Sequence, residues 1–118
     1  MIIVPTRTSI LDAEALHETL QALSDADKLD RTVVVINAPN GDKAVLADIL
    51  RLCADDYEVP VISPGLADDA ALAVSLGKGR SVVDAPRRGA AGKAVLALMG
   101  ELLRHSKRIE RARKRENA

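Results

Sequence analysis

The sequence predicts an α/β fold with a parallel β-sheet, and three observations support this. Thr32–Ile36 is a run of β-branched residues without polar alternation, and the turn residues at positions 37–41 follow it. A run of this kind is typical of a central strand buried on both faces. Two shorter apolar runs, at residues 2–4 and 59–62, flank it, with a helical pattern between each pair. This alternation favours right-handed crossovers and parallel pairing.

The first strand and the two helical patterns can be placed from apolar spacing and polar boundaries. The first strand, ending at Pro5, leads into a polar loop up to Ser9, and we expect Asp12 to cap the helix that follows. Turn-favouring residues at 24–27 should end that helix, whose apolar face is Leu16, Leu20 and Leu23. A second helix is expected from about Asp42 to Asp56. Its apolar residues are Val45, Leu46, Ile49, Leu50, Leu52 and Cys53.

The second half of the chain predicts an edge strand and two further helices. Pro60 lacks a backbone N–H, so the strand at residues 59–62 fits an edge better than the centre of the sheet. A short helix is expected at residues 68–76, and the longest helix from about Arg88 to beyond Arg108. Its apolar stripe is expected to be Val95, Leu98, Met99, Leu102 and Leu103. The packed part of this helix should end near Leu103, because mostly polar residues follow.

Length and charge indicate one small body with a basic tail. The 118 residues allow one domain at most, and the lone Cys53 favours a buried thiol in a cytoplasmic protein. The neutral chain is uneven: residues 104–118 hold seven Lys and Arg against two Glu, a net +5, so the other 103 residues sum to −5. We therefore divide the chain into a body at residues 1–103 and a helical tail at residues 104–118. The amino-terminal apolar run is too short for a signal peptide or a membrane span.

Several segments match a known family in order and spacing. The first is a strand followed by the pattern Pro5, Ser9, Leu11 and Asp12. A strand ending in Asn37 follows, then a strand at residues 59–62, a short helix at 70–76 and a segment at 79–82. Small residues at 89–93 introduce the last helix. Together they resemble the carboxyl-terminal half of the ParA family of partition ATPases, relatives of the MinD division-site proteins. The resemblance implies a three-stranded parallel sheet with about four helices, half of a P-loop NTPase-like doubly wound fold.

The resemblance also implies what this chain lacks. The pattern G-x-x-x-x-G-K-[ST], which cradles a triphosphate, is absent, so we expect no catalytic residues and no cofactor in this chain alone. ATP and magnesium are expected only if a separate chain supplies the phosphate-loop half. Four residues match positions that contact or border adenine in the family, namely Asn37, Pro39, Pro64 and Gly65. They form either a vestigial adenine pocket or simple turn chemistry. Asp68 and Asp69 stand where many family members place a basic DNA-contacting residue.

The basic tail is the strongest candidate for function. Its cations are Arg104, Lys107, Arg108, Arg111, Arg113, Lys114 and Arg115. They suit nonspecific contact with DNA phosphates, although a solvated helix end stabilised by the helix dipole is an equally open interpretation. His17 and His105 are expected to be solvated surface groups without metal partners, and Ser9 a local hydrogen-bonding residue rather than a nucleophile.

Two classes of function follow from these expectations. The first is a truncated plasmid or chromosome partition protein that binds DNA, or a ParB-like partner, without catalysis. The alternatives are a self-associating structural fragment with no ligand and one half of a split ParA-like ATPase. A homodimer or higher homo-oligomer is expected through the apolar edge strand at Ile2, Ile3 and Val4, because its usual neighbour is missing. No membrane partner is expected.

Overall fold

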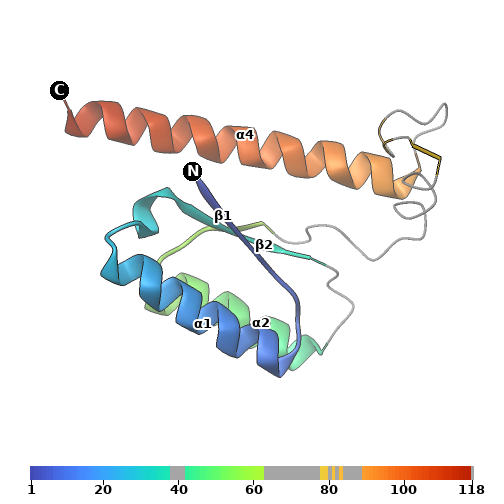
Figure 1. The fold of residues 1–118 in the computed structure, drawn as a ribbon, viewed down its shortest axis with the longest axis horizontal. Helices are drawn as coiled ribbons and strands as arrows, with labels where there is room; N and C mark the ends of the chain where they lie inside the picture. Colours follow the sequence, from blue (N-terminus) through green and yellow to red (C-terminus); the bar gives the residue numbers. More distant parts are fainter. Residues whose placement is uncertain (38–41, 63–77, 80, 82, 84–88, 118) are drawn as a thin grey trace.

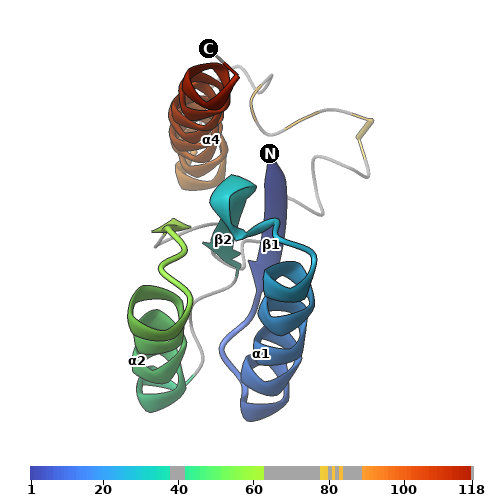
Figure 2. The ribbon, with the colours of Figure 1, turned by 90° about the vertical axis from the view of Figure 1, so that its left-hand side faces the viewer.

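The chain folds as a three-layer α/β structure, seen here in a computed structural model that describes residues 1–37, 42–62, 78–79, 81, 83 and 89–117. Its strands are β1 (Ile2–Thr6), β2 (Thr32–Ile36) and β3 (Val61–Ile62), and its long helices are α1 (Ile10–Asp25), α2 (Lys43–Arg51) and α4 (Ala90–Glu116). α1 and α2 cover one face of the sheet, and α4 crosses the other (Figures 1 and 2). The predicted α/β class is confirmed, whereas the short helix expected at residues 68–76 lies outside the described residues.

The sheet has the predicted parallel arrangement. Within the described residues the strand order is β1-β2-β3, and both pairings are parallel. The register aligns Ile2 with Thr32 and Thr6 with Ile36, so β1 extends one residue beyond Pro5 into the expected loop. β3 begins after Pro60, whose carbonyl oxygen accepts the N–H of Val34 at 3.0 Å. Pro60 thus pairs with the central strand through its carbonyl, and its missing N–H costs no hydrogen bond at the edge of the sheet.

β2 is the centre of the molecule, because its side chains fill two separate apolar clusters. All five of its residues are buried. Val34 and Ile36 pack with α1 and α2, through residues that include Leu16, Leu20 and Ile49. Val33 and Val35 point to the other face and pack with Ile62 and residues of α4. This two-sided burial explains why the strand is apolar at every position instead of alternating.

The caps of α1 refine the predicted boundaries. The N-cap is Ser9 rather than Asp12: the Ser9 hydroxyl oxygen accepts the backbone N–H of Asp12 at 3.1 Å and donates to its carboxylate at 2.6 Å. Asp12 therefore lies three residues after the N-cap, where the helix dipole stabilises a carboxylate. At the other end, Asp27 has a φ of 57°, and the N–H of Lys28 donates to the carbonyl of Leu23 at 2.8 Å. This is a Schellman-type end at the predicted turn.

α2 forms where the sequence predicts a helix, and one residue of its expected apolar face is exposed. The Asp42 side chain caps it by accepting the N–H of Ala44 at 2.8 Å. The helix continues into a π-helical turn at Leu52–Asp56. Cys53 is buried as expected, and burial raises the pKa of its thiol to about 11. Leu50, expected on the apolar face, is exposed instead, because Val45, Ile49 and Cys53 are spaced by four residues and take the inner face.

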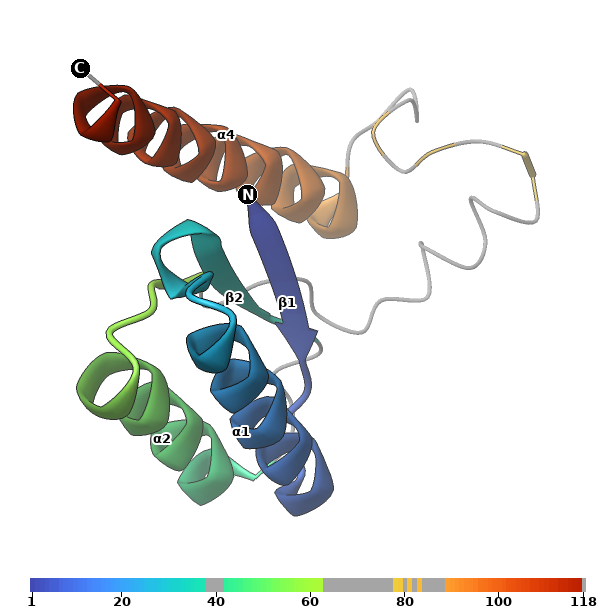
Figure 3. The same cartoon turned by 60° about the vertical axis from the view of Figure 1, so that its left-hand side comes forward.

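α4 differs most from the expectation. Of the predicted stripe, Leu98 and Leu102 pack against the sheet, whereas Met99 and Leu103 are 51% and 60% exposed. Packing also does not end near Leu103, because Ile109 contacts the same cluster of β2 and β3 residues. Ile109 lies seven residues after Leu102, which is two helical turns and returns it to the same face. The tail is therefore the second half of one continuous helix (Figure 3).

The contrast between Leu20 and Leu11 on α1 tests the described core. Leu20 is fully buried and Leu11 is 77% exposed, although both lie on the same helix. Leu20→Ala should lower the free energy of unfolding by about 2–5 kcal/mol, since it leaves a cavity. Leu11→Ala should change it by less than about 0.5 kcal/mol. Urea unfolding followed by circular dichroism measures both, and equal losses would contradict this placement of α1.

Candidate functional site

The carboxyl-terminal half of α4 carries a row of cations on one side. We call the basic face the set Arg104, Lys107, Arg108, Arg111, Lys114 and Arg115, all of which are exposed. Their spacing of three or four residues places them on one side of a helix. Successive residues are about 100° apart, so Arg111 points roughly opposite to Ile109, which packs on the sheet. The basic face is therefore directed away from the protein body.

Arg113 does not belong to the basic face. It is four residues after Ile109, which returns it to the side of α4 that faces the body. There it lines a small cavity together with Asp30, Arg31 and Glu116. Of the seven cations expected to contact DNA, six lie together on one side of α4, and Arg113 lies on the side that faces the body.

Most of the basic face is free of internal ion pairs. Arg104 pairs with Glu101 one turn earlier, and Lys114 lies 3.5 Å from Glu110. Within the described part of the chain, no carboxylate pairs with Lys107, Arg108, Arg111 or Arg115. The cations near the carboxyl end of α4 are also favoured by the helix dipole, so the basic face is compatible with a stable helix end.

His105 reports on the electrostatic field of this helix. It is half-buried rather than fully solvated as expected, and its Nδ1 lies 3.5 Å from an Nη atom of Arg108. Burial lowers the pKa of its imidazole, and the charges of Arg108 and Arg104 lower it further, against a smaller opposing effect of Glu101. The imidazole is therefore neutral at pH 7, and its pKa responds to the charge around it.

Removing the charge of Arg108 should raise the pKa of His105. Arg108→Gln leaves a polar side chain but no cation beside the ring, so the protonated imidazole becomes easier to form. A pH titration of the His105 ring by NMR measures the shift. Arg115→Gln, on the same face but away from the ring, should leave the pKa unchanged. An unchanged value in the Arg108 variant would show that this arginine does not act on His105.

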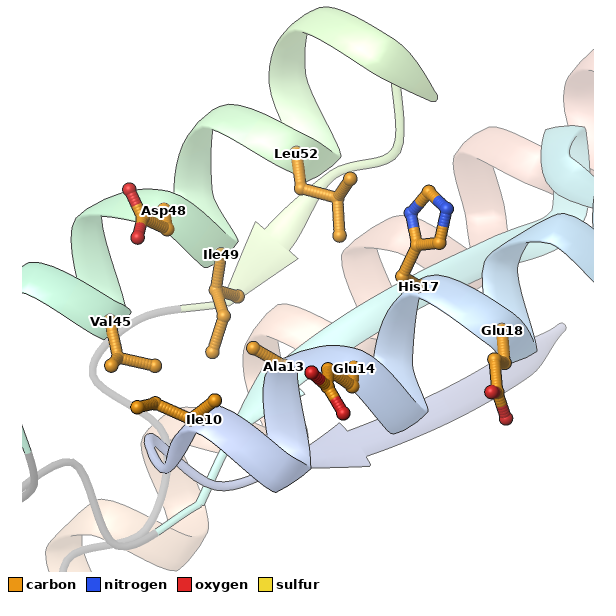
Figure 4. Close-up of a pocket in the computed structure, with 9 residues that line it drawn as sticks. All are labelled: Ile10, Ala13, Glu14, His17, Glu18, Val45, Asp48, Ile49 and Leu52. Carbon is orange, nitrogen blue, oxygen red and sulfur yellow. The ribbon is translucent and has the colours of Figure 1, made fainter.

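A second surface lies between α1 and α2. We call it the helix groove; it encloses about 430 Å³ and opens between the two helices (Figure 4). Its apolar lining is Ile10, Ala13, Val45, Ile49 and Leu52. Figure 4 shows these side chains between the helices, with the strands behind them. Ile10 remains 69% exposed, so the groove leaves a large aliphatic side chain in contact with water.

The rim of the helix groove is acidic. Its polar residues are Glu14, His17, Glu18 and Asp48. Asp48 pairs with Arg51, and the His17 ring packs edge-on against Tyr57 with the ring centroids 5.8 Å apart. Glu14 and Glu18 have no ion pair within the described residues. This groove was not predicted from the sequence; the signal for it was Ile10, an apolar residue outside the face of the helix expected to pack.

A cavity of about 300 Å³ lies at the carboxyl ends of β1 and β2. Thr6, Arg7, Asp12 and Asn37 contribute to its lining. The backbone N–H of Asn37 donates to the carbonyl of Thr6 at 2.7 Å, which continues the pairing of the two strands, and the residue itself is exposed. Pro39, Pro64 and Gly65, the other residues of the suggested adenine pocket, lie outside the described residues. The pocket therefore stays a prediction.

The side chains considered for chemistry have structural roles. Ser9 caps α1, as the expectation of a local hydrogen-bonding role requires. Cys53 is buried, and the raised pKa keeps its thiol protonated at neutral pH. In the part of the chain that the structure describes, no three His, Cys, Asp or Glu side chains gather in a way that could hold a metal ion.

Comparison with known proteins identifies no relative of this chain. No family model, no curated protein and no solved structure matches this chain. No helix among the described residues combines the length and the apolar character needed to cross a membrane. The two surfaces of the molecule are therefore the basis for assigning a function.

Proposed function

We propose that this chain is a non-catalytic DNA-binding module that contacts the phosphate backbone through the basic face of α4. One observation carries the proposal: the six exposed cations of that face point away from the sheet on which the helix is held. A packed helix that presents cations in one direction offers them in a fixed arrangement. Binding then orders fewer side chains and backbone torsions than a disordered tail would have to order.

The length of the basic face suits a duplex backbone. With a rise of about 1.5 Å per residue, Arg104 and Arg115 are separated by roughly 16 Å along the helix axis. Duplex DNA carries one negative charge per about 1.7 Å of its axis, so several phosphates lie within reach of such a row. The face has no aromatic side chain for base stacking, and its long cationic side chains can adapt to any sequence. Binding is therefore expected to be independent of sequence.

The family resemblance of the sequence suggests DNA partition as the setting for this proposed activity. In that setting the chain acts as a ParA-like binding module without catalysis. It holds DNA while a ParB-like partner, or a separate chain with the phosphate loop, supplies the remaining function. The basic face supports the DNA contact alone, and the partition role rests on the resemblance.

Reversing three charges of the basic face should abolish DNA binding. For the parent chain, the logarithm of the association constant should fall linearly with the logarithm of salt concentration, because phosphate contacts release counterions. A variant with Arg108, Arg111 and Lys114 changed to Glu should bind DNA at least about a hundredfold more weakly, since attraction becomes repulsion. Fluorescence anisotropy with labelled duplexes of two unrelated sequences measures both effects.

The matched control changes the same net charge on the protein body. Arg7, Lys28 and Lys43 are exposed and lie off α4, so the triple change to Glu there should weaken binding far less. The thermal midpoint of the α4 variant should stay close to that of the parent, because the three residues contact solvent. Equal loss of binding in both triple variants would show that net charge, and not the basic face, controls DNA affinity.

Self-association through β1 is a second proposed function, which the exposed edge of the sheet supports. Met1 and Ile3 are 45% and 46% exposed, and no described strand pairs with β1 on its outer side. The backbone carbonyl of Thr6 points to β2. Backbone N–H and C=O groups of alternate residues in a strand point to opposite edges, so those of Ile3 and Pro5 point to the outer edge of β1. Because Pro5 has no N–H, Ile3 is the one residue of β1 that offers a donor to a second strand.

Ile3→Pro should therefore weaken self-association and spare the fold. It removes the edge donor, while the N–H groups of Ile2, Val4 and Thr6 still serve the pairing with β2. Val4→Pro is the matched control, because it removes an inner donor and should destabilise the sheet itself. Sedimentation velocity and thermal unfolding separate the two effects. A compact monomer of the parent chain at high concentration would refute pairing at this edge.

A further inference from the structure

Several large aliphatic side chains of the described residues are exposed to water, and two of the surfaces that carry them matter here. One is the helix groove, where Ile10 is 69% exposed. Another is the side of α4 that carries Met99 and Leu103, which we call the outer stripe. We propose that these two surfaces bind each other, so that the helix groove of one copy receives the outer stripe of α4 of a second copy.

The spacing of side chains on the two helices is complementary. On α1, Ile10, Glu14 and Glu18 follow one another at intervals of four residues along the rim of the groove. On α4, an aliphatic residue and two cations repeat the same interval: Leu103, Lys107 and Arg111. Residues four apart lie one above the other on a helix, about 6 Å apart along its axis. A parallel alignment therefore sets aliphatic against aliphatic and each carboxylate against a cation.

The charges at both surfaces are available for such a contact. Glu14 and Glu18 have no ion pair within the described residues, and neither do Lys107 and Arg111. Residues 104–118, which include Lys107 and Arg111, carry a net +5, and the other 103 residues, which include the groove, carry −5. Complementary charge of this kind steers association and fixes the register of an interface, while burial of the apolar residues provides much of its free energy. A second copy of this chain thus meets both requirements of the groove.

The placement of the two surfaces determines what kind of assembly follows. α1 and α2 lie on one side of the sheet and α4 on the other, so a molecule cannot fill its own groove with its own α4 (Figure 2). The contact joins two different surfaces, which makes it heterologous. A heterologous contact that does not close into a ring continues from copy to copy. We therefore expect association that grows with concentration rather than a single discrete dimer.

Charge reversal on either surface tests the proposal. The parent chain should associate at low salt, and less so at high salt, in sedimentation velocity without DNA. A variant with Glu14 and Glu18 changed to Lys, and another with Lys107 and Arg111 changed to Glu, should each lower the association constant at least about tenfold. A chain that carries all four changes restores opposite charges across the contact and should recover association. Circular dichroism establishes that each variant is folded.

A pair of adjacent residues provides the control for the apolar part. Ile10→Ala should weaken association several-fold, whereas Leu11→Ala should not, because Leu11 is exposed but does not line the groove. A parent chain that stays monomeric overturns the proposal. So does association that survives both charge reversals, or a four-residue variant that fails to recover. Association abolished by Ile3→Pro but unaffected by the charge variants assigns the contact to the β1 edge and also overturns it.

Discussion

The fold depends on burying one short strand from both sides. β2 offers Val34 and Ile36 to one face and Val33 and Val35 to the other, and each pair needs a helical layer to exclude water. At about 25 cal/mol per Å² of apolar surface, covering only one face would leave a large part of the stabilisation unused. α1 and α2 form one layer, and among the described residues α4 forms the other. The position of α4 is therefore set by the strand that it covers.

In the part of the chain that the structure describes, one helix lies over the second face of the sheet. α4 presents Leu98, Leu102 and Ile109 to the sheet, and the cations on its opposite side are exposed. The same packing that secures the helix directs the basic face outward and leaves Met99 and Leu103 exposed. Both proposed contacts of α4 are thus consequences of how β2 is buried, and neither requires a loop or a separate tail. The boundary expected at residue 103 falls inside α4, which is one continuous helix.

Sequence patterns predicted the sheet well and the surfaces less well. Five consecutive β-branched residues followed by turn residues favoured a central strand for β2, and all five residues are buried there. In α4, by contrast, Leu98, Met99, Leu102 and Leu103 form a band wide enough for two helix faces, and only the position of the sheet decides which half is buried. The helix groove depends on how α1 and α2 approach each other in space. The half-burial of His105 likewise depends on the continued packing of α4 at Ile109.

The two proposed contacts of α4 share side chains, and this couples them. Lys107 and Arg111 belong to the basic face and also to the row that matches Glu14 and Glu18. A phosphate backbone and a second copy would therefore compete for the same cations, and by linkage each ligand would lower the affinity for the other by the same factor. Salt weakens both contacts, so salt dependence alone does not separate them. Glu14 and Glu18 take part only in the protein contact, because carboxylates repel phosphate. Variants at these two residues act on assembly without removing a DNA-binding cation, which makes the α1 side of the groove the place where the two functions can be separated.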